Sequence, residues 1–256
     1  MIDASAAASL AAGPGQTAPG DFWIGWRRQI DALASAGFRV IVPDQRGYNT
    51  SDKPKAIREY TLPKLVGDVV AIADALGIGR FHLVGHDWGG IVAWAAGAKL
   101  SHRLERLVIL NAPHPEVLLA HSLRSPTKFL RSSYAAFFQF PLLPEAVLGA
   151  GHSALLARAL IKSSRTDAFT AEEIAEYRQA WGRPGALTGM LNWYRALRFR
   201  PSLKQRITTP TLVLGGCRTK LWNMAWPSAV WPFATIGACR RSRRRRIGYS
   251  AKRPAR

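Results

Sequence analysis

The chain has 256 residues, of which 48% are hydrophobic, and a formal net charge of +20 at pH 7. This length suffices for one sizeable domain with an insertion. No apolar run reaches the roughly 18 residues of a membrane span, so we expect no membrane partner. Two cysteines, Cys217 and Cys239, exclude a disulfide framework. No Lys or Arg precedes the apolar patch near the N-terminus, which argues against a secretory signal. A cytoplasmic location is expected.

The charge is concentrated at one end of the chain. Residues 217–256 hold 11 Lys and Arg and no Asp or Glu, whereas residues 1–216 hold 25 bases and 16 acids. An Arg-rich run binds polyanions without specificity. We therefore expect no specific nucleic-acid partner.

The chain begins with strand and helix patterns in alternation. Residues 1–20 are rich in Ala, Gly, Ser and Pro, and are expected to be a disordered leader foreign to the rest. Helical spacing predicts a helix over residues 22–36 that ends at Gly37. An apolar, β-branched run over 38–44 predicts a buried strand. The next helix begins after Thr61, which we expect to cap it.

The alternation continues beyond residue 80. Residues 80–85 and 104–113 have strand patterns, and residues 88–100 between them have a helical one. Short links between such elements predict an α/β fold, in which a mostly parallel sheet has helices on both faces.

The predicted organisation has four parts after the leader is set aside. The α/β core is formed by residues 21–113 and by residues 201–216, and the second of these segments contains the final strand. Residues 114–200 hold aromatics and helix formers without a convincing strand, and form a helical cap. Residues 217–256 have no periodicity and are expected to be a disordered basic tail. Such composition is typical of an out-of-frame GC-rich gene, so we expect a frameshift near Gly216, which the coding DNA would test.

The stretch FHLVGHDWGG, residues 81–90, places an acid between glycines where a strand ends. In a Gly-x-nucleophile-x-Gly turn before a helix, the middle side chain is presented at the carboxyl end of the strand. The helix aims its N–H groups and dipole toward that side chain. Asp87 is therefore a candidate nucleophile, because a carboxylate needs no base to attack an epoxide or alkyl halide carbon. Hydrolysis of the resulting ester requires a His held by an acid.

From about Phe22 to Gly216 the chain resembles the epoxide hydrolase branch of the α/β-hydrolase fold family. The matching stretches are FWIGWRRQI, VIVPDQRGYNTSDKP, LVGHDWGGIVAW, LVILNAPHP, SYAAFFQFPLLPE and LNWYRAL. The resemblance implies that Asp87 is the nucleophile and that the backbone N–H of Trp88 lies in the oxyanion hole. It implies no cofactor, and no His, Cys and Asp cluster has the spacing of a metal site.

Two tyrosines in the predicted cap match the family's donors to the epoxide oxygen. The pattern Tyr-x-x-x-Phe-Gln-x-Pro gives Tyr134, and Asn-Trp-Tyr-Arg gives Tyr194. A phenol suits this task because it donates a hydrogen bond to an oxygen that becomes an alkoxide. Taken singly, each could be a packing aromatic. We expect His86 to be structural, since its side chain points away from that of its neighbour on the turn, and His114 to be a hydrogen-bonding loop residue.

Three parts of the family pattern are absent. QTAPGDFW stands where the family has His-Gly-x-Pro, which supplies the second oxyanion donor. Thr219 occupies the position of the acid, and no His follows His152. The first and last strands of the family sheet are also expected to be missing. Because loss of a triad member costs about 10⁴-fold or more in turnover, we expect very slow ester hydrolysis.

The sequence therefore favours a hydrolase that opens a small hydrophobic epoxide to an enzyme ester and then a diol, with turnover impaired. One alternative is a haloalkane dehalogenase, which shares the Asp-Trp turn and does not need the two tyrosines. Another is a non-catalytic protein whose basic tail binds acidic surfaces. The sequence does not indicate the oligomeric state.

Overall fold

A computed structural model describes residues 6–10, 22–117, 133–164, 168–199, 203–216 and 234–242. Within these residues a parallel sheet of six strands has the order β2-β1-β3-β4-β5-β6. The strands are β1 (Ala6–Leu10), β2 (Arg39–Ile41), β3 (Phe81–His86), β4 (Leu104–Leu110), β5 (Ile207–Gly216) and β6 (Ala234–Ser242). No helix in this part of the chain is long and apolar enough to cross a membrane.

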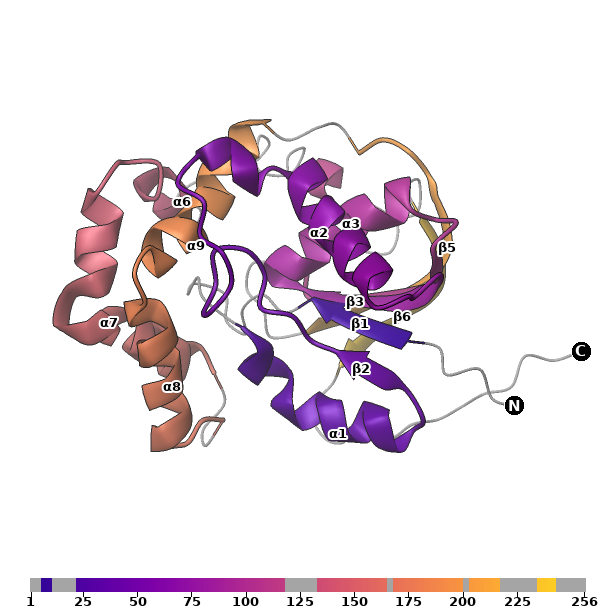
Figure 1. Ribbon diagram of the computed structural model, residues 1–256, viewed down its shortest axis with the longest axis horizontal. Helices are drawn as coiled ribbons and strands as arrows, with labels where there is room; N and C mark the ends of the chain where they lie inside the picture. The colour runs from indigo at the N-terminus through magenta and orange to yellow at the C-terminus, as the bar shows by residue number, and fades with distance from the viewer. Residues whose placement is uncertain are drawn as a thin grey trace, which may run out of the picture.

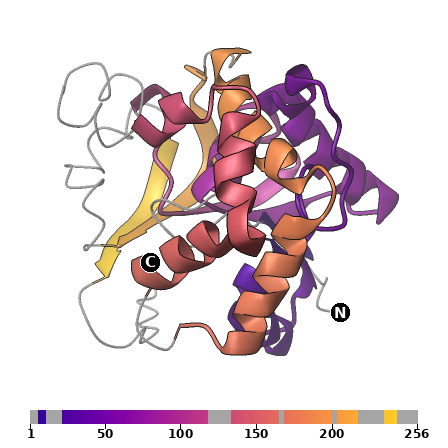
Figure 2. The same ribbon diagram turned by 90° about the vertical axis from the view of Figure 1, so that its left-hand side faces the viewer.

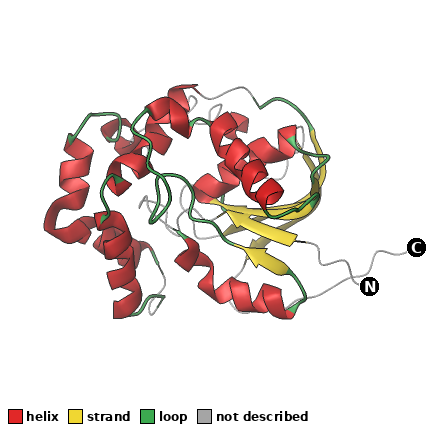
Figure 3. Ribbon diagram, viewed as in Figure 1, coloured by secondary structure: helices red, strands yellow, loops and turns green. Residues whose placement is uncertain are grey.

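The sheet lies between two layers of helix (Figures 1 and 3). The helices of the core are α1 (Arg27–Ser35), α2 (Leu62–Ala75) and α3 (Asp87–Lys99), and the short 3-10 turns are η1 (Trp23–Trp26) and η2 (Ile57–Tyr60). Helices α2 and α3 cover one face and α1 covers the other (Figure 1). Helices on both faces confirm the predicted α/β class.

Helix α3 occupies the centre of the core. It contacts β3, β4 and α2, and every residue from Gly89 to Gly97 is buried. A helix that is apolar all round is buried all round, which its sequence GGIVAWAAG reflects. The end of this helix that carries Asp87 is therefore fixed by packing along its whole length.

Residues 114–200, predicted to be a cap and called the cap below, contain helices, turns and loops but no strand where the structure describes them. It contains α6 (Ser133–Phe137), α7 (Leu143–Ser163), α8 (Ala171–Gly182), α9 (Ala186–Arg195) and the 3-10 turn η3 (Ala196–Phe199). These elements gather on one side of the core, toward the viewer in Figure 2. Helix α8 begins with a capping box in which Thr170 and Glu173 each satisfy a backbone N–H of the other.

Hydrogen bonds hold the cap against the core. The indole Nε1 of Trp193 on α9 donates to the backbone oxygen of Arg46 over 3.0 Å. Arg183, at the end of α8, donates from Nε to Oδ1 of Asn49 over 3.0 Å. The side chain of Arg27 forms an ion pair with Glu173 of α8. Three separate contacts therefore join the cap to the core.

The structure differs from the sequence-based expectation at both ends of the chain. Strand β1 lies within residues 1–20 and pairs in parallel with both β2 and β3, and β6 lies within 217–256 and pairs with β5. Neither segment has strong β propensity. Backbone hydrogen bonds to a neighbouring strand do not depend on side-chain type, proline apart, so β1 can pair between β2 and β3, and β6 can pair with β5 at the edge of the sheet. The rest of both segments lies outside the described residues.

Two local predictions were also wrong. The strand predicted over residues 38–44 is confined to β2, and no β2 residue is fully buried, because β2 lies at the edge of the sheet. Thr61 precedes α2, but it forms no side-chain cap. Its Oγ1 donates instead to the backbone oxygen of Arg58.

Candidate active site

Asp87 lies at the sharp turn between β3 and α3. Strand β3 ends at His86, whose backbone is extended, and Asp87 is the first residue of the helix with φ of 47°. A positive φ is costly for a residue with a Cβ, by about 1–3 kcal/mol, and such strain gathers at functional sites. The turn presents the Asp87 carboxylate at the carboxyl end of a parallel strand near the middle of the sheet.

Two glycines make this turn possible. A Cβ on Gly85 would lie 2.4 Å from the backbone oxygen of Gly89 and 2.7 Å from Cβ of Ala93. A Cβ on Gly90 would lie 2.3 Å from Cβ of Ala112, which follows β4. Glycine at positions 85 and 90 is thus required by the close approach of α3 to β3 and to the residue after β4.

Both predicted tyrosines lie together in the cap. Tyr134 is on α6 and Tyr194 is on α9, and their ring centroids are 6.0 Å apart. The ring of Phe138 packs edge-on against both, at 5.5 Å from Tyr134 and 4.9 Å from Tyr194. The indole of Trp88, the residue after Asp87, is 4.9 Å from the Tyr194 ring. Residues far apart in the sequence therefore form one aromatic cluster beside the turn.

The charge of Asp87 acts on both phenols. Burial is the main cause that raises the pKa of Tyr134 to about 12, and the negative charge of Asp87 adds to the rise. The pKa of Tyr194 lies well above its ordinary value, also mainly through burial, with Tyr134, Asp87 and Tyr48 adding to it and a hydrogen bond with the Trp88 side chain opposing it. Both phenols are therefore protonated donors near a carboxylate at neutral pH.

The backbone N–H of Trp88 belongs to the first turn of α3. The first N–H groups of a helix have no acceptor within the helix, and they carry its positive dipole end. The predicted oxyanion role of this N–H fits its position, and it remains a prediction.

Comparison with known proteins agrees with this geometry. Residues 14–221 match the alpha/beta hydrolase fold family. A solved structure described as novel epoxide hydrolases of the alpha/beta hydrolases superfamily, from metagenomes of hot environments, is 34% identical, with a TM-score of 0.73 over 91% of this chain and 82% of that one. The chain belongs to the epoxide hydrolase branch of the α/β-hydrolase fold family.

Curated relatives of this epoxide hydrolase family member are longer than the matched region. The AB hydrolase superfamily protein YfhM of Bacillus subtilis is 46% identical over 178 residues, which are 70% of this chain and 62% of the relative. Epoxide hydrolase 4 of Mus musculus is 36% identical over 202 residues, which are 77% of this chain and 56% of the relative. The chain thus spans less than two thirds of the length of these relatives.

The remaining parts of the family pattern are not described by the structure. Thr219 and the QTAPGDFW segment up to Asp21 lie outside the described residues, as does His121. Among the residues described, no group of three or more His, Cys, Asp and Glu side chains could hold a metal ion.

Burial and the nearby Arg106 lower the pKa of His82, although Glu105 opposes them. This His lies on β3, five residues before Asp87.

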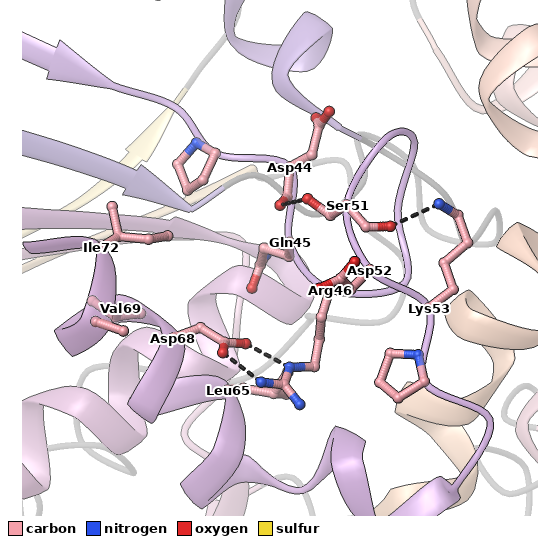
Figure 4. A pocket seen from close by; sticks show the side chains of 13 residues that line it. Asp44, Gln45, Arg46, Ser51, Asp52, Lys53, Leu65, Asp68, Val69 and Ile72 are labelled. Atoms are coloured by element: carbon pink, nitrogen blue, oxygen red, sulfur yellow. Dashed lines mark hydrogen bonds and ion pairs between the residues drawn. The ribbon is translucent and has the colours of Figure 1, made fainter. Parts of the chain in front are cut away.

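A cavity of about 620 Å³ lies elsewhere in the molecule, between α2 and the loop after β2 (Figure 4). Several of its polar side chains are engaged within the protein. Arg46 binds both carboxylate oxygens of Asp68, and Lys53 donates to the backbone oxygen of Ser51. Neither Asp87 nor the two tyrosines line it. The turn and the phenols, rather than this cavity, locate the candidate site.

His114 is a core residue of the loop after β4. Its side chain is fully buried, and its ring centroid lies 5.2 Å from that of Trp94. The backbone N–H of Glu116 donates to its Nδ1 over 3.4 Å. Burial lowers the pKa of His114 to about 4, although the charge of Glu116 opposes this. A neutral, fully buried imidazole matches the prediction of a hydrogen-bonding loop residue.

Replacement of His114 by Asn should reduce acid sensitivity. An unfolded His takes a proton near pH 6.5, whereas folded His114 does so only near pH 4. Stability is therefore lost as the pH falls between these values, by about 2–3 kcal/mol at pH 4.5. Urea unfolding at pH 7 and 4.5 should show that His114→Asn loses less stability than the parent. His102→Asn, at an exposed position, is the control, and an equal loss in all three chains would contradict the prediction.

Sequence reasoning missed three polar residues that form hydrogen bonds among the segments that carry the tyrosines. Arg195, Gln139 and Glu145 lie within the stretches SYAAFFQFPLLPE and LNWYRAL. Arg195 directly follows Tyr194, and Gln139 and Glu145 follow Tyr134 within one short segment, but this proximity does not reveal what they bind. Their function depends on contacts between helices, which the sequence does not display.

Proposed function

We propose that this protein opens small hydrophobic epoxides by forming an ester with Asp87. The observation that carries the proposal is that one carboxylate, at a turn with positive φ, acts on two phenols from separate cap helices. A nucleophile whose charge acts on two proton donors of one aromatic cluster suits the opening of a strained C–O bond.

The first step needs no base. A carboxylate oxygen of Asp87 attacks a ring carbon of the epoxide, and the bond from that carbon to the ring oxygen breaks. The electron pair passes to the oxygen, which receives hydrogen bonds from Tyr134 and Tyr194 and takes the proton of one of them. Water then returns a proton to that phenolate. The product is a hydroxyalkyl ester of Asp87. The high pKa of the phenols keeps the protons available to the forming alkoxide.

The second step is the weak one in this chain. Water must attack the ester carbonyl to release the diol, and the backbone N–H of Trp88 is our candidate to stabilise the oxyanion. A base must take the proton from that water. The 256 residues contain no His after His152, and Thr219 stands where the family has its acid. We propose that the ester accumulates.

The aromatic side chains beside the turn favour an apolar substrate. Trp88, Tyr134 and Phe137 are partly buried and pack against the core, and Phe138 beside them is buried. Aromatic faces contribute binding through apolar contact and leave the two phenols as the donors that orient the substrate. A small epoxide with an aryl or alkyl substituent fits this chemistry.

Incubation of the parent chain with styrene oxide tests the proposal. Intact-mass spectrometry should show one added molecule per chain, on the peptide that contains Asp87, with diol released in no more than about stoichiometric amount because the second step lacks its base. Continuous diol formation would contradict slow hydrolysis. Absence of any adduct, together with halide release from an alkyl bromide, would contradict the choice of epoxide.

A further inference from the structure

Arg195, which follows Tyr194 on α9, is a buried side chain that binds the other tyrosine's segment. Its exposed fraction is 7%. Its Nε donates to the backbone oxygen of Phe138 over 2.9 Å, and its Nη2 donates to that of Phe140 over 2.7 Å. Both Nη atoms also reach the carboxylate of Glu145 on α7, over 2.7 and 3.0 Å. One guanidinium thus joins α9, the end of α6 and the start of α7.

These contacts lead directly to both phenols. The backbone N–H of Phe138 donates to the backbone oxygen of Tyr134 over 2.9 Å, so the carbonyl that Arg195 binds lies one helical turn from Tyr134. The Phe138 ring is also the one that touches both tyrosine rings. A second link runs beside it, since Nε2 of Gln139 donates to the backbone oxygen of Tyr194 over 3.2 Å.

The ion pair with Glu145 makes this arrangement stiff. The side chains of Arg195 and Glu145 are only 8% and 17% exposed. Burial would raise the pKa of Glu145, but hydrogen bonds and the charge of Arg195 hold it below its ordinary value. The planar fork of Arg serves several acceptors at fixed angles, which a Lys ammonium does not reproduce. Loss of either partner would leave the other charge buried and unpaired.

We infer that Arg195 is a positioning residue that sets the separation of Tyr134 and Tyr194, and hence how well both phenols reach the epoxide oxygen. The inference rests on the function proposed above. Arg195 contacts no reacting atom. Its effect passes through the end of α6, and misplacement of a donor by about 1 Å can cost on the order of 10²-fold in rate.

The test compares Arg195→Met with a matched control, Arg27→Met. Arg27 also forms a partly buried ion pair with the cap, to Glu173, but it binds α8 and not α6. We expect Arg195→Met to lower the maximal rate of Asp87 ester formation from styrene oxide by about tenfold or more, with little change in the half-saturating concentration. Arg27→Met should change that rate by less than about threefold. Arg195→Lys and the milder Glu145→Gln should lower this rate by less than Arg195→Met does. Thermal unfolding shows which variants are folded.

A double-mutant cycle separates positioning from general stability. If Arg195 acts through the tyrosines, Arg195→Met should cost much less in a Tyr134→Phe background than in the parent. Equal losses in both backgrounds, or equal losses from Arg195→Met and Arg27→Met, would overturn the inference and leave the proposed function standing. A parent chain that forms no ester would overturn both.

Discussion

Replacement of Asp87 by Asn is expected to abolish ester formation with styrene oxide, a loss on the order of 10⁴-fold or more. The amide has nearly the shape of the carboxylate, but it carries no negative charge and is a very poor nucleophile at carbon. Because Asn tolerates positive φ better than most residues do, the turn at φ of 47° should persist. The measurement is the rate of adduct formation by intact mass, with peptide mapping.

Asp31→Asn is the matched control for this substitution. Asp31 is an exposed carboxylate on α1, so its loss removes one acid without touching the turn. We expect the control to label at the parent rate. If Asp87→Asn labels as fast as Asp31→Asn, the adduct lies on another nucleophile and the proposed function is wrong.

The turn that carries Asp87 could be predicted because its signal is local. An apolar strand, a glycine on each side of Asp87 and a helix without charge between its first and last residues occur within about twenty residues. Sterics leave few conformations for such a stretch. The close contacts at Gly85 and Gly90 are the three-dimensional form of that pattern. The stop at Gly37, with φ of 89°, is predictable for the same reason.

The strands nearest the two ends of the chain, β1 and β6, could not be predicted from composition. The sequence of β1, AAASL, and that of β6, ATIGACRRS, carry neither alternation nor a β-branched run. Their strand conformation comes from pairing with β3 and β5. Strand propensity depends on such context far more than helix propensity does. The local sequence alone therefore did not indicate these two strands.

The support of the tyrosines was hidden for a different reason. Apart from Asn192 on the same helix, the acceptors that Arg195 binds lie 50 to 57 residues away in the sequence. Only the packing of α6, α7 and α9 brings them together. The resemblance to a family identified the two tyrosines as donors but did not indicate which side chains hold them, and a hydrogen-bond network between helices is not written in any periodicity.

Replacement of Tyr134 or Tyr194 by Phe should slow ester formation by about 10²–10³-fold each. Each change removes one hydroxyl and keeps the ring, so the edge-on contacts with Phe138 are preserved. The double variant should lose less than the product of the two factors, because the phenols serve the same oxygen. A control at Tyr177, a buried tyrosine of α8, should label at nearly the parent rate as Tyr177→Phe.

The pH profile of the parent gives an independent check of the same two donors. Burial and Asp87 raise the pKa of Tyr134 to about 12, and that of Tyr194 is well above its ordinary value. A solvent-exposed phenol, with a pKa of about 10, would be half ionised at pH 10 and would no longer donate. We therefore expect the rate of ester formation to change by less than about twofold between pH 7 and pH 10, after subtraction of the reaction without protein. A decline with its midpoint near pH 10 would mean that the phenols face water, and that they do not lie over Asp87 as donors.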